Sequence, residues 1–502
     1  MPAWRYPFLW GAAGIVIGVA LAELPWYLAL GVMVGLTGGA VYAWFKLGWG
    51  RLVWSVPLFA GLGWGRAWIE NKASSPNLRP LMGQLVGVAG YLIEEPARTS
   101  RAYRLLIEAD SVYSYRLHRA LPATGCILLY TRDSSVIHLP AGYGIRAVCR
   151  LDSIRFGQAY WARQKVFLSG YAEQIEKTEI NTGYWQGYIQ RLRQLLINKM
   201  DSTAPATHAP LAVTKALLLG YKRGIDSEVR EAFQLSGTAH ILAVSGMHVG
   251  LVLSLWLFLL RKLPPAWSYH WLSQGFLLVL LVFYGFLTGG SPSAMRAVLM
   301  GSVAILARMQ RQPYLSLNAL GFAAFLQVAA DPTVIYHWGF QFSYAAVGGI
   351  MAFYLPIRLY LLRYPQRENT LLAYFKDLIA ISMAAQMGTF FLNWAYFGRF
   401  PLYFLLANLI AIPLATALAF TAVGWLILMY IPILGKLAAY PVYALAWLLV
   451  EAVSFLSALP GGTLTLPPLP SYMAMPFTLF GIGIGGSWLH RHLQAQKTMW
   501  IV

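Results

Sequence analysis

Long apolar runs separated by short polar connections make up most of this chain. Three such runs open it, at about 8–23, 27–45 and 52–68, and each approaches the roughly 20 residues that cross a bilayer as a helix. Because more runs follow, we interpret the first as a membrane anchor and not as a cleaved signal peptide. From residue 211 the pattern resumes, and it predicts further spans at about 239–260, 270–289, 292–308, 314–330, 341–361, 377–394, 401–430, 437–458 and 472–489.

The run at 401–430 is the longest of these and contains Pro413. It is either one long helix or a re-entrant pair, and the second alternative inverts the topology of everything after it. With one helix there, the pattern predicts a polytopic α-helical membrane protein with about 12 transmembrane spans.

Residues 70–210 follow a different pattern. Up to about residue 182 they contain short β-prone runs separated by Pro, Gly, Asp and Ser, which favour a small closed barrel, with an OB-fold as the leading candidate. Residues 183–200 change to helical periodicity with basic residues beside an apolar stripe, as in a helix that lies on a membrane surface. The expected parts are 1–69 with three spans, the all-β domain 70–182, a surface helix and linker 183–210, the apolar region 211–490 and a tail 491–502.

The composition agrees with a membrane protein and raises a question about charge. Hydrophobic residues make up 58% of the chain and charged residues 11%, which excludes a soluble globular enzyme, a disordered chain and a coiled coil. Lys and Arg number 38 against 19 Asp and Glu, a net charge of +19. Such an excess either fixes membrane topology or meets a polyanion. Residues 70–210 carry +6 of it, and most of the rest falls in connections between spans.

The distribution of basic residues predicts the orientation. Arg5, Lys46 and Arg51 flank the first three spans on one side, so the positive-inside rule places the N-terminus and the tail in the cytoplasm. Residues 70–210 are then extracytoplasmic, and the chain is a multi-pass protein of the inner (plasma) membrane. Cys126 and Cys149 both lie in this external domain, where they form either a disulfide, as an oxidising compartment allows, or two buried thiols.

The stretch 216–250 places polar residues at the start of an apolar span. Arg223, Arg230, His240, Ser245 and His248 all fall there, among several glycines. Polar groups at membrane depth persist where they face a cavity or a partner. The residues alone leave three interpretations open: helix packing through Gly246 and Gly250, the lining of a transport path, or a catalytic or metal site.

The same stretch resembles the signature of the ComEC competence family, the inner-membrane channel proteins of bacterial DNA uptake. Further matches follow in the same order, and the resemblance covers nearly all of residues 1–490, with 211–490 as a competence-type channel domain. The matching segments are ALLLG and SGTAHILAVSGMHVG (216–250), GGSPSAMRAVLM (289–300), NAL (318–320), DP and GFQFSYAAVG (331–348), AAQMGTF and FGRF (384–400), LLANLIAIPL (405–414) and LPG (459–461).

The resemblance implies passage of single-stranded DNA into the cytoplasm, together with proteins that deliver the strand and a motor that pulls it. Phosphates need a hydrated path with cationic or hydrogen-bonding walls. The positions that the resemblance assigns to such a path are Lys222, Arg223, Arg230, His240, Ser245, His248, Ser293, Arg296, Gln341, Ser343, Gln386 and Asn408.

One departure concerns hydrolysis. Longer members of the family continue into a metallo-β-lactamase-like domain with an HxHxDH zinc signature, whereas His490 and His492 here lack the acidic partner. We therefore expect no enzyme activity, no metal and no cofactor. Two other functions stay open: a transporter of another solute, such as a lipid or glycan precursor, and an intramembrane serine hydrolase that uses Ser245 and His248.

Several side chains have a structural interpretation beside the functional one. Arg296 either lines the path or extends to the external headgroups, and Gln341, Gln386 and Asn408 are either path residues or hydrogen-bonding contacts between helices. Glu451 is a mid-span carboxylate that we expect to be protonated or paired, with Arg296 as the candidate partner. The external domain offers aromatic residues for stacking on bases, which are Tyr103, Tyr113, Tyr115, Tyr130, Tyr143, Tyr160 and Trp161.

Overall fold

The computed structural model describes residue 16 and residues 81–483, with gaps of which the longest are 155–165, 179–183, 263–270 and 362–369. Apart from residue 16, the three N-terminal spans lie outside the described residues, as does the tail expected at 491–502. The described chain divides into two compact units. One contains the β-strands up to Asn198 together with Val328–Thr333, and the other contains Lys199–Gln327 and the chain from Val334 onward.

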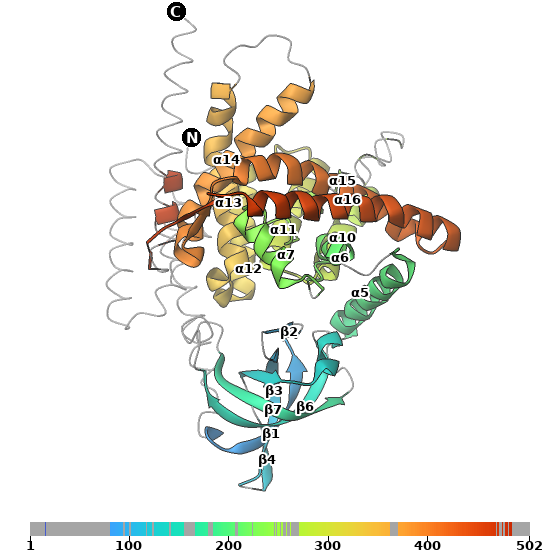
Figure 1. The fold of residues 1–502 in the computed structure, drawn as a ribbon, viewed down its shortest axis with the longest axis vertical. Coiled ribbons are helices and arrows are strands. Elements are labelled where there is room, and N and C mark those ends of the chain that lie inside the picture. The colour runs from blue at the N-terminus through green and yellow to red at the C-terminus, as the bar shows by residue number, and fades with distance from the viewer. Residues whose placement is uncertain are drawn as a thin grey trace, which may run out of the picture. The chain divides into compact units, whose positions relative to one another are not determined.

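Five strands close into a barrel (Figure 1), and two short strands, β2 and β4, pair with β3 beside it. Neighbouring barrel strands are antiparallel except for β5 and β7, which run parallel. Counted in chain order, the barrel strands follow the circuit 1-2-3-5-4-1, which is the arrangement of an OB-fold. The strands are β1 (Leu85–Leu92), β2 (Ala97–Arg98), β3 (Tyr103–Ser114), β4 (Arg119–Pro122), β5 (Cys126–Thr131), β6 (Gly144–Ser153) and β7 (Val166–Thr178), with a 3-10 helix η4 (Ser134–His138) between β5 and β6.

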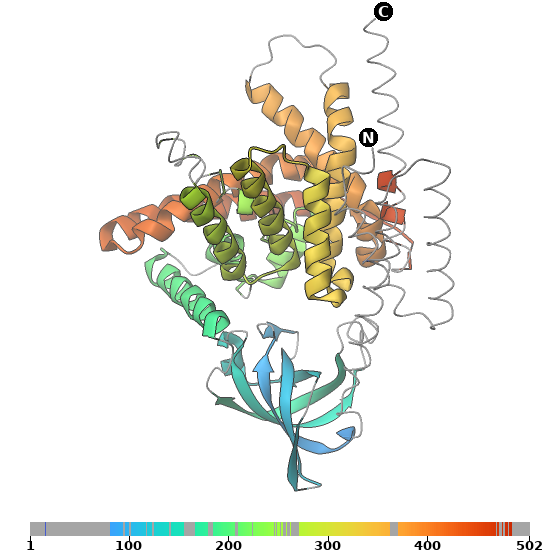
Figure 2. The same cartoon turned by 180° about the vertical axis from the view of Figure 1, so that it is seen from behind.

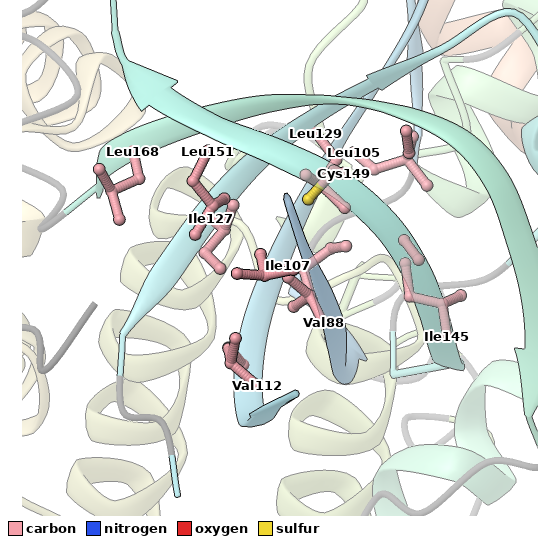
Figure 3. Packing of buried hydrophobic residues seen from close by; sticks show 14 of the residues in the cluster. Val88, Leu105, Ile107, Val112, Ile127, Leu129, Ile145, Cys149, Leu151 and Leu168 are labelled. Carbon is pink, nitrogen blue, oxygen red and sulfur yellow. The ribbon is translucent and has the colours of Figure 1, made fainter. Parts of the chain in front are cut away.

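The barrel interior is filled by aliphatic side chains from alternate positions of the strands. Figure 3 shows Leu105 and Ile107 of β3 facing Ile127 and Leu129 of β5, and all four are fully buried. Burying each such side chain stabilises the fold by about 1.5–3 kcal/mol. The OB-like barrel predicted from the strand pattern is therefore present, with its own hydrophobic core.

The disulfide prediction is wrong in this structure, where Cys126 and Cys149 are not bonded to each other. Strand β7 lies between their two strands, and Cys126 pairs with Val166 of β7 whereas Cys149 pairs with Ala172. Six residues along a strand span about 20 Å, and a disulfide needs Cα atoms within about 7 Å. Cys149 also points into the core, while Cys126 packs on a cluster outside it. The cysteines thus give no support to an oxidising compartment.

The second unit is built of helices. Figures 1 and 2 show α10 and α11 side by side, and α15 and α16 form a hairpin that packs against α6 and α7. The helix predicted at 183–200 is α5 (Tyr184–Thr203), which joins the barrel to this unit. The other helices are α6 (Ala209–Leu219), α7 (Ser227–Leu235), α10 (Trp271–Leu287), α11 (Pro292–Met309), α12 (Ser316–Ala330), η5 (Pro332–Tyr336), α13 (Trp338–Leu361), α14 (Thr370–Phe397), α15 (Phe404–Leu428) and α16 (Pro432–Ala458), and strands β8 (Arg399–Pro401) and β9 (Thr463–Thr465) pair with each other.

Helices α13 and α14 approach each other through small residues. A Cβ added at Gly388 would lie 2.4 Å from the carbonyl oxygen of Ala345 and 2.9 Å from the Cα of Gly349. Ala345 and Gly349 are four residues apart on α13, as Ala384 and Gly388 are on α14, so each helix presents a small-xxx-small face. Membrane helices use this packing because lipid is as apolar as their side chains, so the hydrophobic effect does not drive them together and close contact between backbones does.

Helix α15 resolves the alternative left open at 401–430. It is one continuous helix that contains Pro413, so the re-entrant pair is excluded. A short turn leads into α16, and the indole of Trp425, 1% exposed, donates from Nε1 to the carbonyl oxygen of Gly435 at 3.0 Å. That bond satisfies the one polar atom of the largest fully buried side chain in the described chain.

The described residues contain four helices long and apolar enough to cross a membrane, namely α13, α14, α15 and α16. Helices α6, α10 and α12 are apolar but shorter. The molecule is therefore mostly helical, with membrane-spanning candidates and a five-stranded barrel, whereas the count of about 12 spans is not confirmed.

Candidate functional site

The turn between α10 and α11 places two polar side chains at the start of a helix. Gly289 and Gly290 adopt positive φ angles, at which glycine carries no steric cost, and the chain then enters α11. Ser291 caps the helix by accepting from the backbone N–H of Ala294 at 3.4 Å, and Pro292 occupies the first helical position. Ser293 and Arg296 are then three residues apart on α11, and so lie on one face of the helix.

Arg296 is buried, with 7% of its surface exposed. Its Nε donates to the Oγ of Ser343 on α13 at 2.7 Å, and its Nη1 contacts the Sδ of Met300 at 3.5 Å. The hydroxyls of Ser293 and Ser343 lie 3.1 Å apart. The alternative of an arginine extended to the headgroups is thus excluded, because the guanidinium points into the helical unit.

A third segment meets this cluster at Gly246. A Cβ added there would lie 3.2 Å from the Nη2 of Arg296 and 3.7 Å from the Cβ of Ala297. The absence of a side chain at Gly246 therefore lets the guanidinium lie close to the backbone at this residue. Three segments separated in the sequence, 236–250, 289–300 and 339–348, converge on one buried cation.

No described carboxylate neutralises this cation. Ion pairs between described residues include Lys215 with Asp201 and Arg358 with Asp377, and neither involves Arg296. Glu451 is exposed on α16, so its predicted pairing with Arg296 is wrong: the guanidinium faces serine and methionine on α13 and α11. A buried guanidinium bound by neutral groups alone retains an uncompensated charge, which is costly and which an anion would relieve.

Gln341, Gln386 and Asn408 were each expected to be either a path residue or a hydrogen-bonding contact between helices, and the structure separates them. Gln341, 6% exposed, donates to the carbonyl oxygen of Ile335 at 2.9 Å and accepts from the hydroxyl of Tyr396 at 2.6 Å, so it is a contact between α13 and α14. Asn408 on α15 is 7% exposed, and its Oδ1 has no hydrogen-bond partner in the described chain. Gln386 Nε2 on α14 is also buried without one, as is the hydroxyl of Ser382 one turn earlier, which the sequence did not single out.

Part of the stretch 216–250 has a structural role. Ser236, Gly237 and Thr238 end α7: Gly237 has a φ of 79°, and the N–H of Thr238 donates to the carbonyl oxygen of Phe233 at 2.9 Å. A side chain at Gly237 would meet Phe404 at 2.9 Å, so this turn packs against the start of α15. Asn408 lies one turn after Phe404 and therefore on the same side of α15.

The remaining predicted residues lie outside this cluster, with His240 near His248 and Lys222 near Arg230. Lys222, Arg230 and His240 are exposed, and His248 is buried at 2% exposure. Arg223 and Ser245 lie outside the described residues. The structure thus joins Ser293, Arg296 and Ser343 into one cluster and leaves Lys222, Arg230, His240 and Glu451 apart from it.

A polar cluster on α13 and α14 was missed by the sequence. The hydroxyl of Tyr354 donates to Asp377 Oδ1 at 3.0 Å, and Arg358 pairs with the same carboxylate. Tyr354 and Arg358 are four residues apart on one helix, which was a usable signal, but Asp377 comes from another helix. The contact depends on tertiary packing, which periodicity does not encode.

The aromatic residues predicted to stack on bases do not share one face of the barrel. Tyr103 and Tyr143 pack against the core, and Tyr113 and Tyr115 form an edge-to-face pair with centroids 5.2 Å apart. Tyr130 lies elsewhere, paired in register with Tyr171 of β7, which the sequence did not single out. Tyr160 and Trp161 lie outside the described residues.

Comparison with known proteins gives the family. The family model described as "Competence protein" matches residues 217–492, just over half of the chain, and this span contains all three segments that meet at Arg296. The chain belongs to the competence protein family. The resemblance stated from the motifs is therefore confirmed.

Three curated relatives of this family member are similar over part of their length. "ComE operon protein 3" of Bacillus subtilis is 26% identical over 45% of this chain and 27% of its own. An uncharacterized protein of Aquifex aeolicus is 30% identical over 38% of this chain and 43% of its own, and "Recombination protein 2" of Haemophilus influenzae is 23% identical over 30% and 20%. The match thus spans less than half of each relative. No solved structure matches the chain.

Proposed function

We propose that this chain is an inner-membrane channel that passes single-stranded DNA into the cytoplasm during natural transformation. Membership of the competence family supports a role in DNA uptake. The single observation that carries the proposal further is Arg296, a buried cation held by Ser343, Met300 and Gly246 with no described carboxylate beside it.

The chemistry of the cluster suits a phosphate. A guanidinium presents five N–H donors in a planar fork that matches phosphate oxygens in two-point contacts. Ser343 holds Nε at 2.7 Å and so fixes the plane of the fork, while the Nη groups retain hydrogens for a passing anion. The hydroxyls of Ser293 and Ser343 add donors beside it.

A channel must also release what it binds. One cation with neutral partners attracts a phosphate without the several simultaneous contacts that would trap it, as conduction requires. Asn408, Gln386 and Ser382 supply buried polar atoms without partners in the described chain, and such atoms favour water beside α14 and α15. We assign these residues to a hydrated wall of the path.

The orientation belongs to the same proposal. We place the N-terminus in the cytoplasm and residues 70–210 outside, where the barrel meets DNA before passage. Delivery proteins outside and a pulling motor inside are the partners this requires. We assign no catalytic residue, and among the described residues no group of three His, Cys, Asp or Glu side chains is arranged to hold a metal.

The test replaces Arg296 by Gln and, separately, by Lys in cells that take up DNA. We expect Arg296→Gln to reduce arrival of labelled DNA in the cytoplasm at least about tenfold, because one charge-assisted contact to phosphate is lost, while Arg296→Lys retains part of it. Arg308→Gln, at the other end of α11, is the matched control and should leave uptake unchanged. Normal uptake in Arg296→Gln at normal protein abundance would refute the site.

A further inference from the structure

The outer face of the barrel carries a row of four side chains across four strands. Arg104 of β3 pairs in register with Tyr130 of β5, Tyr130 with Tyr171 of β7, and Tyr171 with Arg150 of β6. Residues opposite each other on neighbouring strands project from the same face. This face is the outer one, because the chain neighbours of the four residues are buried: Leu105, Leu129, Gly170 and Cys149.

A pocket opens beside the two tyrosines. Its volume is about 260 Å³, below the roughly 300–1,000 Å³ of sites for drug-sized ligands, so it suits a single ring system. At its edge Ser169 of β7 donates to the carbonyl oxygen of Ser153 of β6 at 3.4 Å. The side chains and backbone that line it include Tyr130, Tyr171, Gly170, Asp152, Ser153 and Ser169.

Three side chains that line this pocket, and Arg150 beside it, have polar groups that the fold does not use, although the ring of Tyr130 also packs on the cluster of Leu106 and Leu128. Within the described chain, Tyr130, Tyr171, Arg150 and Asp152 make no side-chain hydrogen bond or ion pair, and Arg150 and Asp152 do not pair with each other although both face outward on β6. Tyr171 is 45% exposed. Aromatic faces, a cation and a carboxylate are therefore all available to a ligand at one place.

We infer that this pocket takes one base of a single DNA strand and prefers a base with an exocyclic amine, so that cytosine binds better than thymine. The base stacks on Tyr130 and Tyr171, the neighbouring phosphates meet Arg150 and Arg104, and the Asp152 carboxylate accepts from the amine. Thymine presents a carbonyl oxygen where cytosine presents its amine, and that oxygen repels the carboxylate. This inference rests on the proposed passage of single-stranded DNA.

The charge of the domain favours a nucleic acid over the other ligand that stacks on tyrosines, a neutral sugar. Residues 70–210 carry 17 Lys and Arg against 11 Asp and Glu, and two of those arginines flank the tyrosine pair. This net positive charge attracts a polyanion and so strengthens its binding, whereas it does not attract an uncharged oligosaccharide.

The test uses the purified full-length protein in detergent micelles. Fluorescence anisotropy compares labelled oligo(dC) with oligo(dT) of equal length at one salt concentration, since the two bases have nearly equal stacking area. We expect the parent protein to bind oligo(dC) about fivefold more tightly than oligo(dT). Tyr171→Ala should weaken the affinity for each oligomer about tenfold, because a stacking face is lost. Asp152→Asn should make the two affinities similar.

Tyr113→Ala is the matched control, because Tyr113 is a similarly exposed tyrosine of the same barrel that packs on Tyr115 away from the pocket. It should change neither affinity. Should Tyr171→Ala lower the thermal stability of the protein, Tyr171→Phe separates the causes, because it keeps the stacking face and should keep the binding.

Equal affinity of the parent protein for the two oligomers, or full binding by Tyr171→Ala, would overturn the inference, as would oligosaccharide displacing the DNA at the pocket. Each of these three results leaves the proposed channel standing if uptake still depends on Arg296. Equal affinity of the parent protein for the two oligomers together with normal DNA uptake in Arg296→Gln would instead contradict both the pocket inference and the proposed channel.

Discussion

In the barrel, Ile107 and Leu129 are enclosed by other aliphatic side chains, whereas in the helical unit α13 and α14 approach each other closely through two glycines, Gly349 and Gly388. The first arrangement is stabilised by removing apolar surface from water. The second cannot be, because lipid is as apolar as the side chains, and it depends on close backbone packing and polar bonds between helices.

This difference changes what a polar residue means in each region. Arg150 on the barrel is exposed to water and costs nothing to keep, so its role must be argued from its neighbours. Arg296 is buried among helices, where each unneutralised charge is expensive, so its presence alone points to a function. An arginine alone is therefore weak support for a functional site on the barrel and strong support for one inside the helical unit.

The largest expected effect comes from breaking the glycine contact. Gly388→Leu adds a side chain whose Cβ would lie 2.4 Å from the carbonyl oxygen of Ala345, so α13 and α14 must separate and we expect loss of folded protein from the membrane. Gly424→Leu on α15, which has open space at its Cβ, is the matched control and should fold. Immunoblotting of membranes and size-exclusion profiles measure both, and a well-folded Gly388→Leu protein would contradict this packing.

A smaller loss of stability is expected from a substitution that leaves a cavity in the barrel core. Leu129→Ala should lower the free energy of unfolding of the barrel by about 2–5 kcal/mol, because it removes buried methyl groups from a closed core. Leu85→Ala, at an exposed position of β1, should change it by less than about 0.5 kcal/mol. Urea unfolding followed by tyrosine fluorescence gives both values, and equal losses would show that the core is not where the structure places it.

The smallest effect concerns the buried thiol of Cys149. Burial raises its pKa from the ordinary 9.0 to about 12, so the fold disfavours the thiolate. The stabilisation is fully present below about pH 9 and is lost as the pH rises toward about 12. The stability advantage of the parent over Cys149→Ala, measured by urea unfolding at each pH, should therefore shrink over that range.

A constant advantage of the parent over Cys149→Ala across that pH range would contradict the burial of the thiol. Electrophoresis with and without reductant tests the related point. The structure predicts equal mobility, since the two cysteines are not bonded.

The sequence predicted the elements better than the contacts between them. Strand alternation and turn residues predicted the OB-like barrel, and hydrophobic runs predicted α10 to α13 and α15 within about three residues at each end. The runs missed the first turns of α14 and α16, which begin at Thr370 and Pro432 and not at the predicted 377 and 437. It failed for the cysteine pair, because which strand lies between β5 and β6 depends on the order of strands in the barrel. It failed for Tyr171 for the same reason, since only the parallel β5–β7 pairing brings that residue beside Tyr130.

For the helical site, Arg296 could be singled out from the sequence because a cation inside an apolar run is costly. Its partners could not be derived in that way. Ser343 and Gly246 come from segments about 50 residues away on either side, and a small polar residue in an apolar helix has many possible neighbours. The predicted Glu451 partner shows the error: opposite charges suggested a pair, but helix packing turned Glu451 outward.

The most direct test of the account is passage of labelled single-stranded oligonucleotide into vesicles that contain the purified protein. The account predicts passage by the parent and by Arg308→Gln, at least about tenfold slower passage by Arg296→Gln, and an intermediate rate for Ser343→Ala, which keeps the charge but no longer fixes the guanidinium. Equal rates in the parent and Arg296→Gln would contradict it.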